Sequence, residues 1–234
     1  AYLARLADTL PIALDSPVTR IDWSDARVRV ETASGLTLGA RSVIVTVPMM
    51  VLRESLAFTP ALPPGIRAAI DGFHTGIYEH AVLHWPSSPF RGADRLASIV
   101  GGRHRPPGLL ARLDGTPFHY FELDAPSAAA IDAGLGGADA ARRHVRAVLA
   151  EHFGFARLHD LAIPAVSAWR HDPWSRGSWA VVPPGHAGAR QALQDSVCGR
   201  IRFAGEALSR LQWGTAGGAY QEGMRAADAA ADAL

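Results

Sequence analysis

Hydrophobic and polar positions alternate in three short runs near the start of the chain, and this period of two predicts β-strands. Turn residues separate the runs, which therefore predict an antiparallel meander over Val18–Trp23, Arg27–Thr32 and Leu36–Arg41. The next run, Ser42–Val47, does not alternate and is rich in β-branched residues, as is typical of a strand buried on both faces of a larger sheet. An apolar lead-in over residues 1–15 predicts a helix that ends at Pro11.

Helical spacing appears farther along the chain. Apolar residues recur every three or four positions over residues 136–153, which predicts a helix ended by Gly154. The Ala-rich tail from Gly218 to Leu234, after a Gly-rich turn, predicts another, and a short helix is expected around Gly65–Ile70. Further strands or extended segments are predicted at Gly76–Trp85, Leu96–Val100, Leu109–Leu113, Phe118–Leu123, Ile163–Trp169 and Arg176–Val182.

The order of these segments predicts a mixed α/β (α+β) chain with a discontinuous domain. Sheet-forming runs lie at both ends, and a mixed block lies between them. We therefore expect residues 1–60 and 196–234 to form one unit, with residues 61–195 inserted into it.

Composition excludes several classes of protein. Of 234 residues, 48% are hydrophobic and 19% charged, which is ordinary for a globular chain. The net charge of +1 gives no field that would steer the chain to nucleic acid or to an anionic membrane, and no apolar run approaches the roughly 20 residues of a transmembrane helix. The single cysteine, Cys198, excludes an intrachain disulfide and a cysteine-based zinc site. All 23 basic residues are arginine, so no lysine of this chain can form a Schiff base.

The most informative stretch lies near the C-terminus. A short apolar strand at Arg200–Ala204 ends in Gly205-Glu206, and a Gly-rich loop and a helix follow over Gly214–Ala227. Ligands often bind where strands end and helices begin, because free backbone N–H groups and the helix dipole favour electron-rich groups there. The Glu206 carboxylate can accept hydrogen bonds from sugar or polyol hydroxyls. On spacing alone, a strand–loop–helix without a ligand fits the pattern as well.

The segments FAGE and TAGGAYQEGMRAA resemble the C-terminal FAD-binding segment of the flavin-containing amine oxidases, which include monoamine, polyamine and L-amino-acid oxidases. SVIVTVP at Ser42–Pro48 and the stretch from Trp169 to Trp179 are similar to that family in order and spacing. The resemblance implies a partial Rossmann-like FAD-binding domain in residues 1–60 and 196–234, and a mixed-sheet substrate domain in 61–195. The family's GxGxxG fingerprint has no counterpart here. We therefore expect a C-terminal half that works with a separate N-terminal chain carrying it, or a fragment of a longer enzyme.

The resemblance implies that FAD is bound without a covalent link, because Ser178 stands where some members carry the attaching cysteine. It places Val18 at the adenine end, Glu206 at the ribityl chain and Trp169 against the isoalloxazine ring. The full set of implied cofactor residues is Val18, Trp169, Gly205, Glu206, Gly214, Thr215 and Ala216, the last three through backbone N–H groups at the flavin ring.

The resemblance also implies substrate and catalytic residues. Trp179 matches one wall of an aromatic cage in front of the flavin, whereas the other wall falls on Thr215, which is not aromatic. Trp213, two residues earlier, is the aromatic residue that could replace it. His80 stands where the family carries a lysine that holds a water near flavin N5, and is the expected catalytic residue. A purely structural role for His80 is the alternative.

The implied activity is that of one subunit of an FAD-dependent amine oxidase in the cytoplasm of a bacterium. A hydride would pass from the carbon that bears a neutral amine to flavin N5, the imine would hydrolyse, and molecular oxygen would yield hydrogen peroxide. The substrate would be a small amine or an amino acid. Two alternatives stay open: a subunit of an L-amino-acid oxidase, which needs an arginine clamp for the carboxylate, and a non-catalytic partner subunit without flavin.

Overall fold

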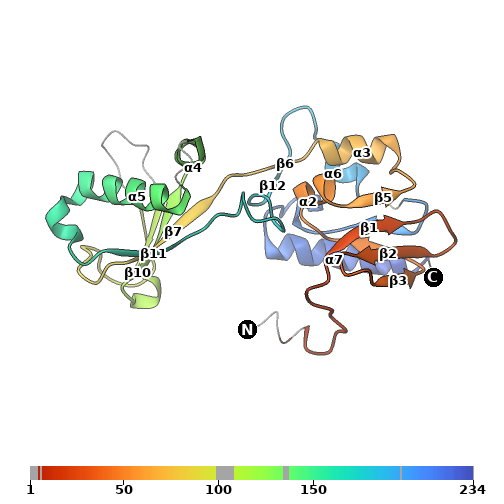
Figure 1. Ribbon diagram of the computed structural model, residues 1–234, viewed down its shortest axis with the longest axis horizontal. Helices are drawn as coiled ribbons and strands as arrows, with labels where there is room; N and C mark the ends of the chain where they lie inside the picture. Colours follow the sequence, from red (N-terminus) through yellow and green to blue (C-terminus); the bar gives the residue numbers. More distant parts are fainter. Residues whose placement is uncertain (1–4, 6, 99–107, 134–136, 196, 234) are drawn as a thin grey trace. The chain divides into compact units, whose positions relative to one another are not determined.

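The computed structural model describes residues 5, 7–98, 108–133, 137–195 and 197–233. The chain forms two compact units, one made of Ala1–His74 and Ala180–Leu234 and the other of Thr75–Trp179 (Figure 1). The boundaries therefore lie at 74/75 and 179/180, not at the expected 60/61 and 195/196. The reason is packing: buried residues on both sides of the second expected boundary, and Ile70 and Phe73 after the first, share the core of the first unit.

The meander at the start of the chain is confirmed. Its strands are antiparallel neighbours in a four-stranded sheet of order β3-β2-β1-β5. The fourth strand runs parallel to β1. The strands are β1 (Val18–Asp22), β2 (Val28–Thr32), β3 (Thr37–Ala40) and β5 (Ala57–Thr59).

A second, parallel sheet in the first unit joins distant parts of the chain. β4 (Val43–Val45) pairs in parallel with β13 (Ile201–Phe203), so that Val45 stands beside Phe203. All three residues of β13 are buried, but Val43 and Ile44 are half-buried. Among the described residues β4 pairs with β13 alone. The expectation that this run is buried on both faces of a larger sheet is therefore wrong for this chain, since no other described strand adjoins it.

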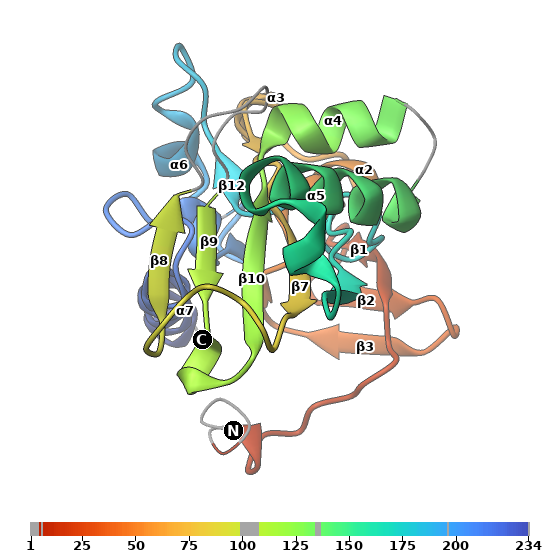
Figure 2. The ribbon, with the colours of Figure 1, turned by 90° about the vertical axis from the view of Figure 1, so that its left-hand side faces the viewer.

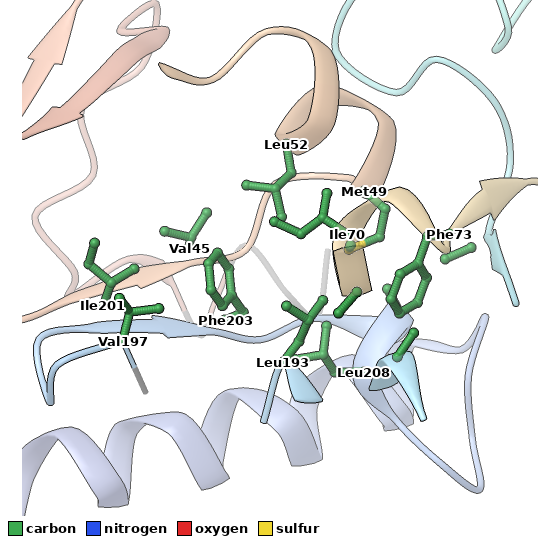
Figure 3. Packing of buried hydrophobic residues seen from close by; sticks show 14 of the residues in the cluster. Val45, Met49, Leu52, Ile70, Phe73, Leu193, Val197, Ile201, Phe203 and Leu208 are labelled. Atoms are coloured by element: carbon green, nitrogen blue, oxygen red, sulfur yellow. The ribbon is translucent and has the colours of Figure 1, made fainter. Parts of the chain in front are cut away.

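Helices pack around this parallel pair. They are α2 (Met49–Glu54), α3 (Pro64–Asp71), α6 (Ala189–Ala192), α7 (Ala216–Ala231) and the 3₁₀ turn η3 (Glu206–Leu208). Figure 3 shows the core in which Met49, Ile70, Leu193, Phe203 and Leu208 come together from these elements. α7 begins at Ala216, two residues before the predicted start, because Thr215 caps it.

The second unit is built on a five-stranded antiparallel sheet of order β11-β7-β10-β9-β8. Its strands are β7 (Glu79–His84), β8 (Arg95–Ser98), β9 (Gly108–Ala111), β10 (Phe118–Leu123) and β11 (Ala162–Val166). Its helices are α4 (Ala125–Ala133), α5 (Gly137–Phe153), η1 (Leu113–Gly115) and η2 (Phe155–Leu158). The end of the predicted strand Leu96–Val100 lies outside the described residues.

One face of this sheet is covered by helices. Figures 1 and 2 show α5 alongside the sheet, and buried residues of β7, β9 and β10 share a core with Val145 and Leu149 of α5. Because side chains alternate along a strand, the residues between these buried positions face the other way. His80, Tyr120 and Glu122 therefore lie on the face of the sheet opposite to α5.

Three smaller segments complete the fold. β6 (His74–Thr75) and β12 (Ala180–Val181) form a two-stranded sheet. The extended segment expected at Arg176–Val182 is confined to β12, because Asp172 accepts backbone hydrogen bonds from Ser175 and Arg176 in a preceding turn. The lead-in helix expected to reach Pro11 lies partly outside the described residues, and residues 8–10 form a turn and a bend. No described helix has the length and apolar character needed to cross a membrane.

Candidate functional site: a carboxylate beside a helix N-terminus and a row of aromatic rings

Glu206 lies three residues after the end of the buried strand β13. Gly205, between them, has φ of 120°, a conformation that L side chains rarely adopt. The half-buried Glu206 carboxylate accepts one hydrogen bond from the Ala180 amide (2.9 Å) and another from the Gly214 amide (2.7 Å). One carboxylate thus joins β12, the end of β13 and the Gly-rich loop.

The N-terminus of α7 follows this loop. The Thr215 hydroxyl accepts from the Gly218 amide (3.0 Å) and donates to the Gln212 carbonyl (2.7 Å). A Cβ at Gly218 would overlap that Gln212 carbonyl, so the close approach requires glycine. Among the described residues, the Ala216 amide has no hydrogen-bond acceptor, as expected in the first turn of a helix.

These residues fit the polar parts of a flavin. A carboxylate has about four acceptor positions, and Glu206 uses two of them, so it can still accept from a ribityl hydroxyl. The Ala216 amide is available for an electron-rich ring atom. The Gly214 amide donates to Glu206 in this structure, and the expectation that it approaches the flavin ring stays a prediction. The hydrogen bond between the Gly214 amide and the Glu206 carboxylate joins residues eight positions apart, and no local sequence pattern shows it.

Trp213 lies in the wall of a basic hollow in the same unit. The Arg190 guanidinium stands 5.5 Å from the ring centres of both Phe73 and Trp213, and donates to the Ala207 carbonyl. Burial lowers the pKa of Arg190, and the charge of Glu206 opposes this shift. The hollow has a volume of about 480 Å³ and is also lined by Arg210. No local pattern in the sequence predicts this position of Arg190.

A row of rings lies on the face of the second unit's sheet opposite to α5. The rings of Trp179 and Tyr78 have centres 5.1 Å apart, Tyr78 meets His80 edge-on at 4.5 Å, and His80 lies 6.0 Å from Tyr120. Trp179 is 38% exposed. Sequence reasoning named Trp179 and His80 but missed Tyr78 and Tyr120. The sequence did indicate that Tyr78 and His80 share a face, because they alternate with the buried Glu79 at the period of a strand.

The electrostatic setting of the row favours a neutral imidazole. Burial lowers the pKa of His80, and the charges of Glu122 and Glu79 partly oppose that shift. Burial also raises the pKa of Tyr78, with a further contribution from Glu122. The lowered pKa favours the neutral form of His80, which can accept a proton or a hydrogen bond.

Trp169 is held by its backbone, and the residue is 48% exposed. The Glu79 carboxylate, only 2% exposed, accepts from the amides of Trp169 and Arg170 at 3.2 Å each. The Arg170 guanidinium forms an ion pair with Glu79 at 3.6 Å and with Asp132 at 2.7 Å. Sequence reasoning missed Glu79, because a carboxylate inside a strand pattern gives no local sign of its partners.

The sequence-predicted site residues fall into two groups. Glu206 brings Gly205, Gly214 and Thr215 together in the first unit, with Ala216 next along the chain. Val18, in β1 of that unit, pairs with Thr32 and is 38% exposed. Tyr78 joins Trp179 to His80 in the second unit, where Trp169 also lies.

A mixed α/β chain with a strand-end carboxylate, a Gly-rich loop and a capped helix N-terminus offers polar groups that can hold a nucleotide cofactor. The model of the family described as flavin containing amine oxidoreductase matches residues 1–231, and the chain belongs to that family. The resemblance drawn from the sequence motifs is thereby confirmed.

Individual relatives agree with this membership. Lysine-specific histone demethylase 1B of Mus musculus is 30% identical over 96% of this chain and 28% of its own length. Polyamine oxidase 4 of Oryza sativa subsp. japonica is 29% identical over 95% of this chain and 46% of its own. A solved putrescine oxidase mutant superposes with a TM-score of 0.74 at 20% identity, over 93% of this chain and 48% of that one, which shows the shared fold. The chain thus spans less than half the length of each of these proteins.

Proposed function

We propose that this chain is one part of an FAD-dependent amine oxidase, and that it works with a polypeptide carrying the GxGxxG dinucleotide fingerprint. The observation that carries the proposal is the Glu206 carboxylate, held beside the N-terminus of α7 in a chain of the flavin containing amine oxidoreductase family. The sequence has no GxGxxG motif of its own, and the relatives named above are more than twice as long.

In this proposal, Glu206 and the Ala216 amide hold the ribityl chain and the ring of a non-covalent FAD. When bound, FAD supplies the acceptor for a hydride from the carbon bearing the amine, and molecular oxygen as final acceptor gives hydrogen peroxide. Ser178 carries a hydroxyl and provides no thiol for a covalent link.

The chain's own residues prepare the amine. Trp179 and Tyr78 form an aromatic wall that excludes water and orients the amine nitrogen. A protonated amine has no lone pair to support hydride loss, so the ammonium must first lose its proton. The neutral His80 ring, which lies against Tyr78, accepts that proton or holds the water that does.

The test is a visible spectrum of the tagged chain purified from its native source with whatever it retains. We expect a yellow complex that releases flavin on denaturation and contains a second polypeptide with the fingerprint. Glu206→Gln keeps the size of the side chain but removes its charge, and should weaken flavin retention about tenfold. Glu31→Gln, on β2 of the same unit, is the matched control and should retain flavin. A colourless chain that gains no flavin on addition of FAD and of the second polypeptide would overturn the proposal.

A flavin-free partner subunit is the second candidate. Thr215 at the expected second wall of the cage, and the absence of any lysine, favour it. A stable complex with a second polypeptide in which flavin binding is unchanged by Glu206→Gln would support that candidate instead.

A further inference from the structure

The basic hollow of the first unit is lined by two guanidinium groups and by no carboxylate. Neither Arg190 nor Arg210 forms an ion pair with any residue that the structure describes. The charge of Glu206 acts on Arg190, but both carboxylate oxygens are engaged, one with the Ala180 amide and the other with the Gly214 amide. The hollow therefore presents two positive charges that no described acidic residue neutralises.

The guanidinium of Arg190 is held in place without a ligand. It stands over the rings of Phe73 and Trp213, 5.5 Å from each centre, and its Nη1 donates to the Ala207 carbonyl. Among the described residues that carbonyl is its one acceptor, so most of its N–H donors are unused. Burial lowers the pKa of this half-buried group, because a cation withdrawn from water without a counter-charge is costly. A bound anion would remove that cost.

The charge and walls of the hollow indicate what kind of anion it suits. The planar fork of a guanidinium matches the oxygens of a phosphate, and a phosphate monoester carries about two negative charges at pH 7.5, one for each arginine. The exposed Trp213 and the prolines Pro183 and Pro184 add apolar walls against which a flat ring can lie. The volume of about 480 Å³ is within the range of pockets that hold small organic ligands.

We propose that the basic hollow binds a phosphate monoester that carries a planar ring, with its phosphate on Arg190 and Arg210 and its ring against Trp213. This inference concerns residues of the first unit alone and does not depend on amine oxidation. FAD also carries phosphates and rings, so FAD itself is the competing occupant of the hollow. The experiment therefore uses protein that is already saturated with FAD.

The test is calorimetry at pH 7.5 on the full chain, purified with its co-purifying polypeptide and saturated with FAD. The probes are phenyl phosphate, benzenesulfonate, which has the ring but one negative charge fewer, and inorganic phosphate, which lacks the ring. We expect phenyl phosphate to bind at least tenfold more tightly than either of the others, and Arg210→Gln to weaken its binding about tenfold. Arg67→Gln, an exposed arginine of α3 in the same unit, is the matched control and should leave the binding unchanged.

A second variant tests the ring without changing the charge. Trp213→Leu should weaken phenyl phosphate about fivefold and leave inorganic phosphate unaffected, because only the ring contact is lost. Arg210 and Trp213 are both exposed, so the fold should survive either change.

Three results would overturn the inference. The first is no binding of phenyl phosphate to the FAD-saturated protein, and the second is equal weakening by Arg210→Gln and Arg67→Gln. The third is release of FAD by phenyl phosphate, which would assign the hollow to the flavin. Binding that coexists with FAD and is lost in Arg210→Gln would uphold the site, whether or not any amine reduces the flavin.

Discussion

Ser167 donates a hydrogen bond from its hydroxyl to the carboxylate of Glu79, and the same hydroxyl accepts the His80 amide at 2.8 Å. The Ser167 side chain, which follows β11, thereby forms hydrogen bonds with Glu79 and His80, two successive residues of β7. The Ser167 amide also donates to the His80 carbonyl at 2.8 Å. This relationship fixes the segment that carries Trp169 against the strand that carries His80, so two sequence-predicted site residues share one support.

The first prediction concerns that support. Glu79→Gln leaves Arg170 without its buried partner and leaves fewer acceptors for the amides of Trp169 and Arg170. Breaking such a pair should lower the free energy of unfolding by about 3 kcal/mol. Urea unfolding followed by tryptophan fluorescence measures it, with Glu151→Gln as the exposed control. Equal midpoints for the two variants would contradict the support that we assign to Glu79.

The second prediction is a pH dependence of stability that arises from His119. The ring is fully buried, its Nδ1 accepts from the Arg112 amide (3.2 Å), and its Nε2 lies 3.4 Å from the Trp85 carbonyl. These contacts fix the neutral tautomer with its proton on Nε2, and burial lowers the pKa of His119 below its ordinary 6.5. Below pH 6.5 the unfolded chain therefore binds a proton that the folded chain does not, and stability falls as pH falls, by up to about 1.4 kcal/mol per pH unit.

Urea unfolding at pH 7.5, 6.5 and 5.5 checks this dependence. His119→Gln cannot take up the proton and should flatten the slope below pH 6.5, although it is less stable throughout. The pKa of His80 is lowered too, so His80→Gln serves as a comparison and should remove a separate part of the slope. A slope unchanged by His119→Gln would assign the acid sensitivity to other groups.

The third prediction uses two glycines of α7. A Cβ at Gly218 would overlap the Gln212 carbonyl and lie 3.0 Å from Ser209 Cβ, whereas a Cβ at Gly223 meets nothing within 4 Å. Gly218→Ala should therefore destabilise the chain by about 2 kcal/mol. Gly223→Ala should stabilise it by about 0.5–1 kcal/mol, because alanine favours the helix. Thermal unfolding of both variants measures the contrast, and changes of the same sign would refute it.

The fourth prediction concerns Trp179 in the proposed enzyme. Trp179→Ala removes the ring that packs on Tyr78 and should raise KM or lower kcat about tenfold with flavin still bound. Trp174→Ala is the matched control, since Trp174 is 61% exposed in the same unit and outside the row of rings. Steady-state kinetics with the flavin content determined in parallel would distinguish the two. Identical kinetics for both variants would remove Trp179 from the site.

The local elements and the C-terminal motif could be predicted from the order of residues along the chain. Alternation of residue types predicted the meander, helical spacing predicted α5, and the contiguous stretch from Gly205 to Ala216 predicted the carboxylate beside a helix N-terminus. Such features depend on neighbours a few residues apart, and period and turn residues record them directly. The FAGE and TAGGAYQEGMRAA segments are also runs of neighbouring residues, so the resemblance to the family could be found without the fold.

Contacts between residues that are distant in the sequence became known from the folded chain alone. The Gly214 amide donates to Glu206, Ser167 holds Glu79, and Glu122 stands opposite His80 because of a strand register that no local pattern records. The unit boundaries followed the packing of α3 and α6 around one core, and the prolines at 60–64 did not mark them. Burial and neighbouring charges set the charge state of a side chain. The chemistry of His80 and Glu122 could therefore be inferred only from the paired strands β7 and β10.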